Sequence, residues 1–233
     1  MHITRTHRAG LLVVALLALG ACSSEAAGPA PEPAAFGYDD NLSHHPTTYG
    51  TVGPGYPDPA DPPAPAATFT PEPGAWSDVR PPEGFTVTLV AAGQDPAAAA
   101  VVDAVTAWAA AESVDLDVVT VDQPADNLAD LSAAIVAEPD LIMSAGDSLV
   151  DAMALVTASA PERRFLILGG EIPEPTFNVT AVDWLGAGFR VEGRPRPSTY
   201  DPATFTVERS DRAVRAGVAA VLTNWSGYVV WVS

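Results

Sequence analysis

Residues 139–156 read PDLIMSAGDSLVDAMALV, and this stretch holds the patterns from which the fold can be predicted. The short apolar run DLIMSA predicts a buried strand, and the small residues after it predict a turn. From Ser148 the apolar residues recur at helical spacing until Pro161 ends the pattern. A buried strand that leads through a tight turn into a helix is the repeating unit of a parallel α/β sheet.

The same unit recurs along the chain from residue 85. Predicted strands start near residues 85, 115, 140 and 164, which places them 24 to 30 residues apart. Asp95-Pro96 marks a helix start, because Asp is a preferred N-cap and Pro suits the first helical position. NVTAVDW and GYVVWV predict two further strands. We therefore predict a single α/β domain over residues 85–233, with a three-layer, doubly wound and mostly parallel sheet.

The N-terminus predicts export from the cytoplasm. Basic residues precede an apolar run too short to span a membrane, so residues 1–21 are expected to be a secretory signal peptide. LGAC at residues 19–22 is similar to the bacterial lipobox, whose cysteine thiol receives a diacylglycerol; the alternative is an ordinary signal peptide and a chance cysteine. Cys22 is the only cysteine of the chain, so no intrachain disulfide can form. We expect lipidation at Cys22 and a location on the extracytoplasmic face of the cell membrane.

Between Cys22 and the predicted domain lies a segment rich in proline. Residues 23–84 contain 14 prolines among 62 residues, with PGYPDPADPPAPA near the centre. Proline favours the extended polyproline II conformation, which makes no internal hydrogen bonds. Residues 22–84 are therefore predicted to be a disordered tether. Whether Trp76 packs against the domain is left open.

The charge of the chain limits its partners. The formal net charge is −18 and every Lys or Arg is an Arg, which argues against nucleic-acid binding because that depends on basic contacts to phosphates. Six arginines nevertheless gather within 26 residues: Arg190, Arg194, Arg196, Arg209, Arg212 and Arg215. They predict either a solvated face paired with Glu208 and Asp211 or a docking patch for an acidic partner.

The residue types missing from the domain exclude most catalytic chemistry. Residues 85–233 contain no His, Cys or Lys, which excludes a Ser-His-Asp triad, a thiolate nucleophile and a Schiff-base lysine. AAGQD after the first predicted strand matches neither a dinucleotide fingerprint nor a P-loop. We expect no enzyme, no cofactor and no metal site. A carboxylate-pair glycoside hydrolase is the remaining catalytic alternative.

Polar residues at the predicted strand ends are the candidate ligand-binding residues. Ligands of open parallel sheets sit outside the carboxyl ends of the strands. The residues in question are Asp95, Ser144, Gly146, Asp147, Asp151 and Gly170. Carboxylates and hydroxyls there would suit a small polyhydroxylated or cationic ligand. The alternative is structural, with Asp95 and Asp147 as N-caps and the glycines as turn residues.

Residues 139–189 resemble the basic membrane protein (BMP) family of ABC-transporter substrate-binding lipoproteins. The resemblance rests on Asp140-Leu141-Ile142, Asp151-Ala152, Pro161 with Arg164-Phe165, and Asn178-Val179 with Gly186 and Gly188. It implies one lobe of a type I periplasmic-binding-protein-like fold, a nucleoside- or sugar-like ligand and an ABC permease as a partner. The family has a second lobe for which this chain has no room. The alternative function is a non-catalytic envelope interaction module with a degenerate ligand crevice.

Overall fold

Seven parallel strands form one sheet in the computed structural model, which describes residues 49–93, 95–122, 127–173, 176–188 and 199–233. The strands are β1 (Thr68–Phe69), β2 (Thr86–Ala92), β3 (Asp115–Val121), β4 (Leu141–Ala145), β5 (Phe165–Leu168), β6 (Val179–Asp183) and β7 (Val229–Trp231). The helices are α1 (Pro96–Glu112), α2 (Asn127–Val136), α3 (Val150–Thr157) and α4 (Val207–Leu222), with a 3₁₀ turn, η3, at Pro202–Thr204.

The order of the strands confirms the predicted doubly wound α/β fold. Across the sheet the order is β1-β7-β6-β5-β4-β2-β3, and each neighbouring pair is parallel. The chain runs from β2 outward to β3 and then returns to the other side of β2 with β4. The carboxyl ends of β2 and β4 therefore form the topological switch point, where open α/β sheets place their ligands.

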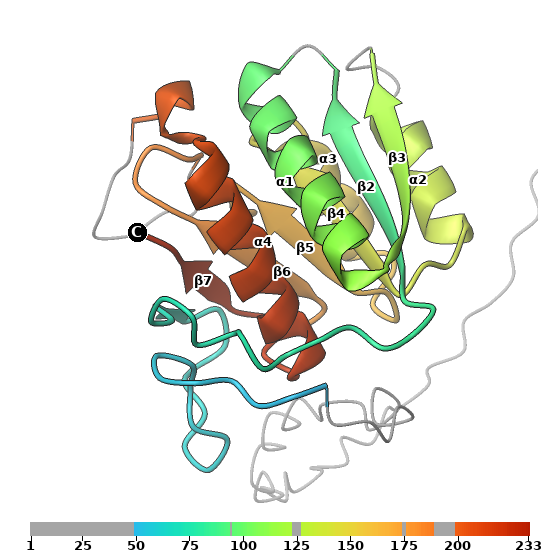
Figure 1. Cartoon of the computed structure of the whole chain (residues 1–233). Coiled ribbons are helices and arrows are strands. Elements are labelled where there is room, and N and C mark those ends of the chain that lie inside the picture. Colours follow the sequence, from blue (N-terminus) through green and yellow to red (C-terminus); the bar gives the residue numbers. More distant parts are fainter. Residues whose placement is uncertain (1–48, 94, 123–126, 174–175, 189–198) are drawn as a thin grey trace, which may run out of the picture. The chain divides into compact units, whose positions relative to one another are not determined.

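Helices cover both faces of the sheet, as the fold class requires. Helices α1 and α4 lie on one face and α2 and α3 on the other (Figure 1). Residues along β4 alternate between the two faces: Leu141 and Met143 belong to the core under α1 and α4, and Ile142 to the core under α2 and α3. Because both faces are covered, the central strands are mostly apolar, with a few buried polar residues such as Ser144 and Thr180.

The expected domain boundary at residue 85 is wrong, because residues 49–84 pack against the domain. We call residues 49–84 the strap; they belong to the compact unit Thr47–Ser233. Strand β1 of the strap pairs with β7 as a parallel edge strand, and Val79 is buried in the core of the α1–α4 face. The Tyr56 hydroxyl donates a hydrogen bond of 2.9 Å to the Ala216 carbonyl of α4. Trp76, left open by the sequence, packs partly buried on the same core.

Proline did not prevent the strap from ordering, for a local reason. A proline cannot donate to a sheet ladder, but it is tolerated next to a short edge strand. Strand β1 is only two residues long and lies between Pro65 and Pro71. Aromatic rings of the strap then supply the buried area: Tyr56 and Phe69 lie 5.4 Å apart between ring centroids.

The predictions for residues 1–48 lie outside the described residues. They include the signal peptide, the lipidation of Cys22 and the first part of the tether, which remain predictions. Within the described ranges, no helix is both long and apolar enough to cross a membrane.

Candidate functional site

The site is the carboxyl edge, by which we mean the carboxyl ends of β2, β4, β5 and β6 with the turns that follow them. Strands β2 and β4 are in register up to Ala91 and Ala145, so the turns after them lie side by side. Asp95 follows β2 and Ser148 follows β4, and the Ser148 hydroxyl donates a 2.8 Å hydrogen bond to Oδ2 of Asp95. The two predicted strand ends therefore meet through their side chains.

Asp95 has a structural role as well as a position at this edge. Its Oδ1 accepts a 2.9 Å hydrogen bond from the backbone N–H of Ala97, which makes Asp95 the N-cap of α1 and confirms the structural interpretation of this residue. Its Oδ2 accepts from Ser148 and is not used by the cap. The carboxylate is half-buried, so one side of it faces the edge.

Asp147 lies between Gly146 and Ser148, two residues that approach Asp95, but it is not an N-cap. Helix α3 begins at Val150, two residues later than predicted, and its capping residue Leu149 makes no side-chain cap bond. The side chain of Asp147 lies directly against Gly188: a Cβ at Gly188 would come within 2.1 Å of Asp147 Oδ1. Only a glycine at position 188 leaves room for this carboxylate.

Gly146 allows the turn after β4 to come close to Asp95, in the turn after β2. Its φ of +76° is a conformation that favours glycine, and a Cβ there would lie 3.1 Å from Asp95 Oδ2. Asp151 lies one turn further along, in the first turn of α3, with an exposed side chain. Three of the six predicted ligand residues (Asp95, Gly146 and Asp147) are therefore in one place, with Asp151 nearby.

Ser144 and Gly170 lie inside the fold, away from solvent. Ser144 is fully buried within β4, and by the alternation of the strand it faces α2 and α3. Gly170 is buried after β5, where a Cβ would lie 2.9 Å from Cγ2 of Val150. Gly170 thus allows the turn after β5 to approach the start of α3, and Ser144 has no access to a ligand at the surface.

Tyr200 is a residue of the site that the sequence did not single out. Burial and, to a smaller extent, the negative charges of Asp95 and Asp147 raise the pKa of Tyr200, so the phenol lies within electrostatic range of both carboxylates. The side chain is still 41% exposed and so remains open to a ligand. A signal was present: Asp201-Pro202 repeats the pattern of Asp95-Pro96, and Asp201 does cap a helical turn, η3.

Residues 199–206 cover the part of the carboxyl edge that follows β5 and β6. The Phe205 ring packs 4.8 Å from the Trp184 ring between centroids, and Trp184 Nε1 donates to Thr204 Oγ1 at 3.1 Å. Gly169 lies under Phe205, where a Cβ would come within 2.5 Å of the ring. This turn is packed onto the sheet ends and positions Tyr200 beside the switch point.

The described arginines of the predicted cluster are bonded within the domain. Arg209 donates to the Thr204 carbonyl and Arg212 to the Ser233 carbonyl. Arg215 pairs with Asp211 at 2.9 Å, as the solvated-face interpretation predicts, and with Glu112 at 3.5 Å. Arg190, Arg194 and Arg196 lie outside the described residues. No group of three His, Cys, Asp or Glu side chains in the described ranges could hold a metal ion.

Comparison with known proteins adds similarities of fold. No protein-family model and no curated protein matches the chain. A solved solute-binding protein of an ABC transporter system from Aeropyrum pernix is 20% identical with a TM-score of 0.40, over 44% of this chain and 29% of that one. Another from Conexibacter woesei is 15% identical with a TM-score of 0.38, over 64% of this chain and 54% of that one.

One of the similar structures is described by another function. A transcriptional activator of the comK gene from Bacillus halodurans is 12% identical with a TM-score of 0.37, over 64% of this chain and 54% of that one. The chain thus spans between about a third and about half of the length of these proteins. Fold similarity at this level transfers neither ligand nor partner, so the function has to be argued from the site.

Proposed function

We propose that this chain is an envelope-anchored, solute-binding-type lipoprotein whose carboxyl edge takes a small nucleoside- or sugar-like ligand. The observation that carries the proposal is the meeting of Asp95, Asp147 and Tyr200 at the switch point of the sheet. The protein would be lipidated at Cys22, would catalyse no reaction, and would have an ABC permease as its natural partner.

The three side chains provide complementary hydrogen-bonding groups. Carboxylate oxygens accept hydrogen bonds from ligand hydroxyls, and a phenol both donates and accepts. A tyrosine phenol, with an ordinary pKa of about 10, keeps its proton at neutral pH and can donate; burial and the two carboxylates raise the pKa of Tyr200 further. Two carboxylates in one place disfavour phosphate, so an uncharged polyol or a cation fits better than an anion.

The geometry also predicts modest affinity. Ligand pockets usually bury most of the ligand surface between opposing walls. Here the described residues provide the sheet edge and the turn that carries Tyr200. A ligand on such a face stays partly in water unless a second copy or another protein covers it.

The alternative, an interaction module built on the arginine cluster, has less support. Arg209 and Arg212 donate to backbone carbonyls, and Arg215 is paired with two carboxylates. Each of these guanidinium groups already donates to an acceptor within the domain. To form a bidentate pair with an acidic partner, each arginine would have to give up such a contact.

The experiment is thermal unfolding of the purified chain with a panel of nucleosides, sugars and polyamines. A ligand at 100 times its Kd adds about 2.7 kcal/mol, which is a shift of several degrees for a domain of this size. Asp147→Asn should abolish the shift, and the double variant with Asp151→Asn should do so as well. The matched control is Glu162→Gln, an exposed carboxylate paired with Arg163.

A panel without any shift, from a chain that unfolds cooperatively, would overturn the proposal. So would a shift that survives in the Asp147→Asn/Asp151→Asn double variant, because the ligand would then bind elsewhere.

A further inference from the structure

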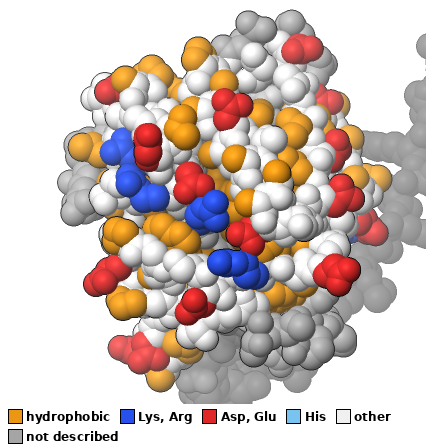
Figure 2. Space-filling view, viewed as in Figure 1, with side chains coloured by type: hydrophobic (Ala, Val, Ile, Leu, Met, Phe, Trp, Pro, Cys, Tyr) orange, Lys and Arg blue, Asp and Glu red, His pale blue; other side chains and the backbone are white. Residues whose placement is uncertain are grey.

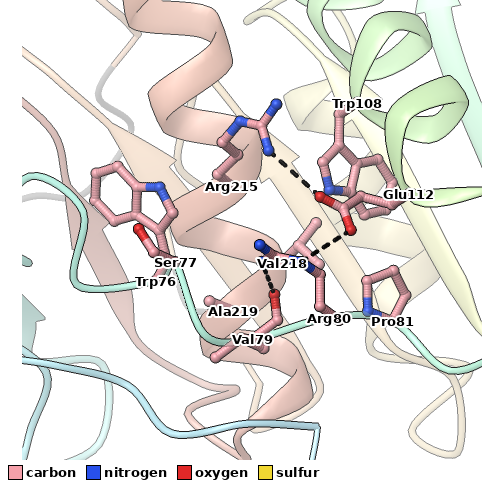
Figure 3. Close-up of a pocket in the computed structure, with 10 residues that line it drawn as sticks. All are labelled: Trp76, Ser77, Val79, Arg80, Pro81, Trp108, Glu112, Arg215, Val218 and Ala219. Atoms are coloured by element: carbon pink, nitrogen blue, oxygen red, sulfur yellow. Dashed lines mark hydrogen bonds and ion pairs between the residues drawn. The ribbon is translucent and has the colours of Figure 1, made fainter.

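A hollow lies on the α1–α4 face, where the strap crosses the two helices (Figure 3). Its volume is about 240 Å³. The strap forms its outer wall and the two helices form its floor. The lining residues are Trp76, Ser77, Val79, Arg80, Pro81, Trp108, Glu112, Arg215, Val218 and Ala219.

Two guanidinium groups from distant parts of the chain share one carboxylate in this hollow. Arg80 Nε lies 3.3 Å from one oxygen of Glu112, and Arg215 Nη1 lies 3.5 Å from the other. The Glu112 side chain is only 14% exposed, so it is largely removed from water. Figure 3 shows this carboxylate between the two arginines. The lining therefore carries more positive than negative charge, in a chain whose net charge is −18.

Each of the two guanidinium groups has N–H donors that are not used within the described part of the domain. Each guanidinium has five N–H donors in a fixed plane. Arg80 uses Nε toward Glu112 and Nη1 toward the Val79 carbonyl. Arg215 uses Nε toward Asp211 and Nη1 toward Glu112. No acceptor among the described residues takes a hydrogen bond from Nη2 of either arginine, so both can bind a further oxyanion.

Flat apolar surface borders these cations. The indole of Trp108 is buried at 2% exposure, and Trp76 lies half-buried on the strap side of the hollow. Val218 and Ala219 of α4 add aliphatic surface between them (Figure 3). Indole rings favour contact with flat, apolar groups. The hollow thus combines free guanidinium donors with walls suited to a ring.

We propose that this hollow is a binding site for a small aromatic carboxylate. The ring of the ligand lies against the half-buried indole of Trp76, and its carboxylate faces Arg80 and Arg215. Arginine side chains form a diagonal row across the surrounding face, with acidic side chains between them (Figure 2). The site is separate from the carboxyl edge: α1 joins them, and its 17 residues span roughly 25 Å at 1.5 Å per residue.

The test is calorimetric titration of the purified chain with benzoate and with benzamide. The two probes have the same ring and nearly the same size, but only benzoate carries a charge. We expect benzoate to bind at least about tenfold more tightly, since hydrogen bonds to charged groups are worth about 1.5–3 kcal/mol. Arg215→Gln should weaken benzoate by a similar factor and leave benzamide unchanged.

A second variant separates binding from the stability of the strap. Ser77 lines the hollow and is exposed, so Ser77→Trp should fill the space while leaving Arg80, Glu112 and Arg215 in place. It should abolish benzoate binding without lowering the unfolding temperature. The control is Asp147→Asn, which belongs to the carboxyl edge and should leave benzoate binding unchanged.

Three results would overturn the proposal: no benzoate binding, equal affinity for benzoate and benzamide, or unchanged benzoate affinity in Ser77→Trp. The arginines would then serve only to fasten the strap to α1 and α4. None of these results bears on the carboxyl edge, whose test uses other ligands and another variant.

Discussion

The two ends of helix α1 handle charge in opposite ways. At its N-terminus Asp95 caps the helix, and Asp147 and the phenol of Tyr200 lie near it. At its C-terminus Glu112 lies between two guanidinium groups. The first end gathers acceptors for hydroxyl groups, and the second gathers donors for an anion. One helix thus separates two surfaces of opposite chemical preference.

The two ends also differ in how far apart their residues lie in the sequence. The side chains around Asp95 mostly follow strand ends, whose positions the βα repeat predicts. The residues around Glu112 come from the strap, from α1 and from α4, with Arg80 and Arg215 separated by 134 intervening residues. The βα repeat in the sequence predicts the site around Asp95. It does not predict the site around Glu112, because that site depends on how the strap packs.

Removal of the strap is expected to lower the unfolding free energy most. It changes the surroundings of the C-terminal end of α1 and leaves the N-terminal end in place. A chain that begins at residue 85 loses the partners of α4 and the hollow, including the side chains of Tyr56, Phe69, Trp76 and Val79. At 1.5–3 kcal/mol for each large buried side chain, and with allowance for partial burial, we expect a loss of about 5 kcal/mol. Urea unfolding of chains that begin at residues 49 and 85 measures it.

The chain that begins at residue 49 is the matched control, since it keeps every described residue. Equal unfolding free energies for the two chains would contradict the packing of the strap and would restore the domain boundary at residue 85. A lower unfolding free energy in the chain that begins at residue 85 would confirm that the strap packs against α1 and α4.

The fold was predictable because its signals are local and repeated. The central strands β4 and β5 are short, mainly apolar runs, and Asp95-Pro96 begins α1 as predicted. The strap was not predicted, because a high density of proline indicates disorder, whereas two ladder residues and a few aromatic rings are enough to order the segment. Composition describes an average over a segment, but packing depends on particular side chains.

The candidate site was predicted in part, for a similar reason. Asp95, Gly146 and Asp147 come together because parallel strands end at one edge. Ser144 was wrongly assigned to the edge although the predicted strand DLIMSA already contained it: the alternation of β4 turns its side chain into the core under α2 and α3. Tyr200 was missed because Asp201-Pro202 predicts only that a helical turn begins there; the pattern does not show that this turn, 53 residues after Asp147, returns to the edge.

Substitution of Asp95 is expected to lower the unfolding free energy by the next largest amount. It changes only the N-terminal end of α1. Asp95→Ala removes the cap of α1 and the acceptor of Ser148, so we expect the unfolding free energy to fall by about 1 kcal/mol. Asp95→Asn keeps a capping oxygen and should cost much less. Chemical denaturation of both variants separates the cap from the charge. Equal losses in the two variants would show that the negative charge, not the cap, stabilises the helix end.

The smallest effect concerns Tyr200 and appears only at alkaline pH. Folding raises the pKa of this phenol above its ordinary value of about 10, so the folded chain holds the proton more tightly than the unfolded chain. The resulting stability is fully present below pH 10 and is lost as the pH rises through the folded-state pKa. Tyr200→Phe should therefore match the parent chain at neutral pH and lose less stability above pH 10.

Tyr56, whose pKa burial also raises, is present in both chains, so its contribution cancels in this difference. The ultraviolet difference spectrum between the parent chain and Tyr200→Phe isolates the phenolate of Tyr200. Asp95→Asn should move that titration toward the ordinary value, because it removes one of the two negative charges beside the phenol. An unchanged titration would mean that Asp95 and Tyr200 do not share a site, and the grouping at the N-terminal end of α1 would have to be abandoned.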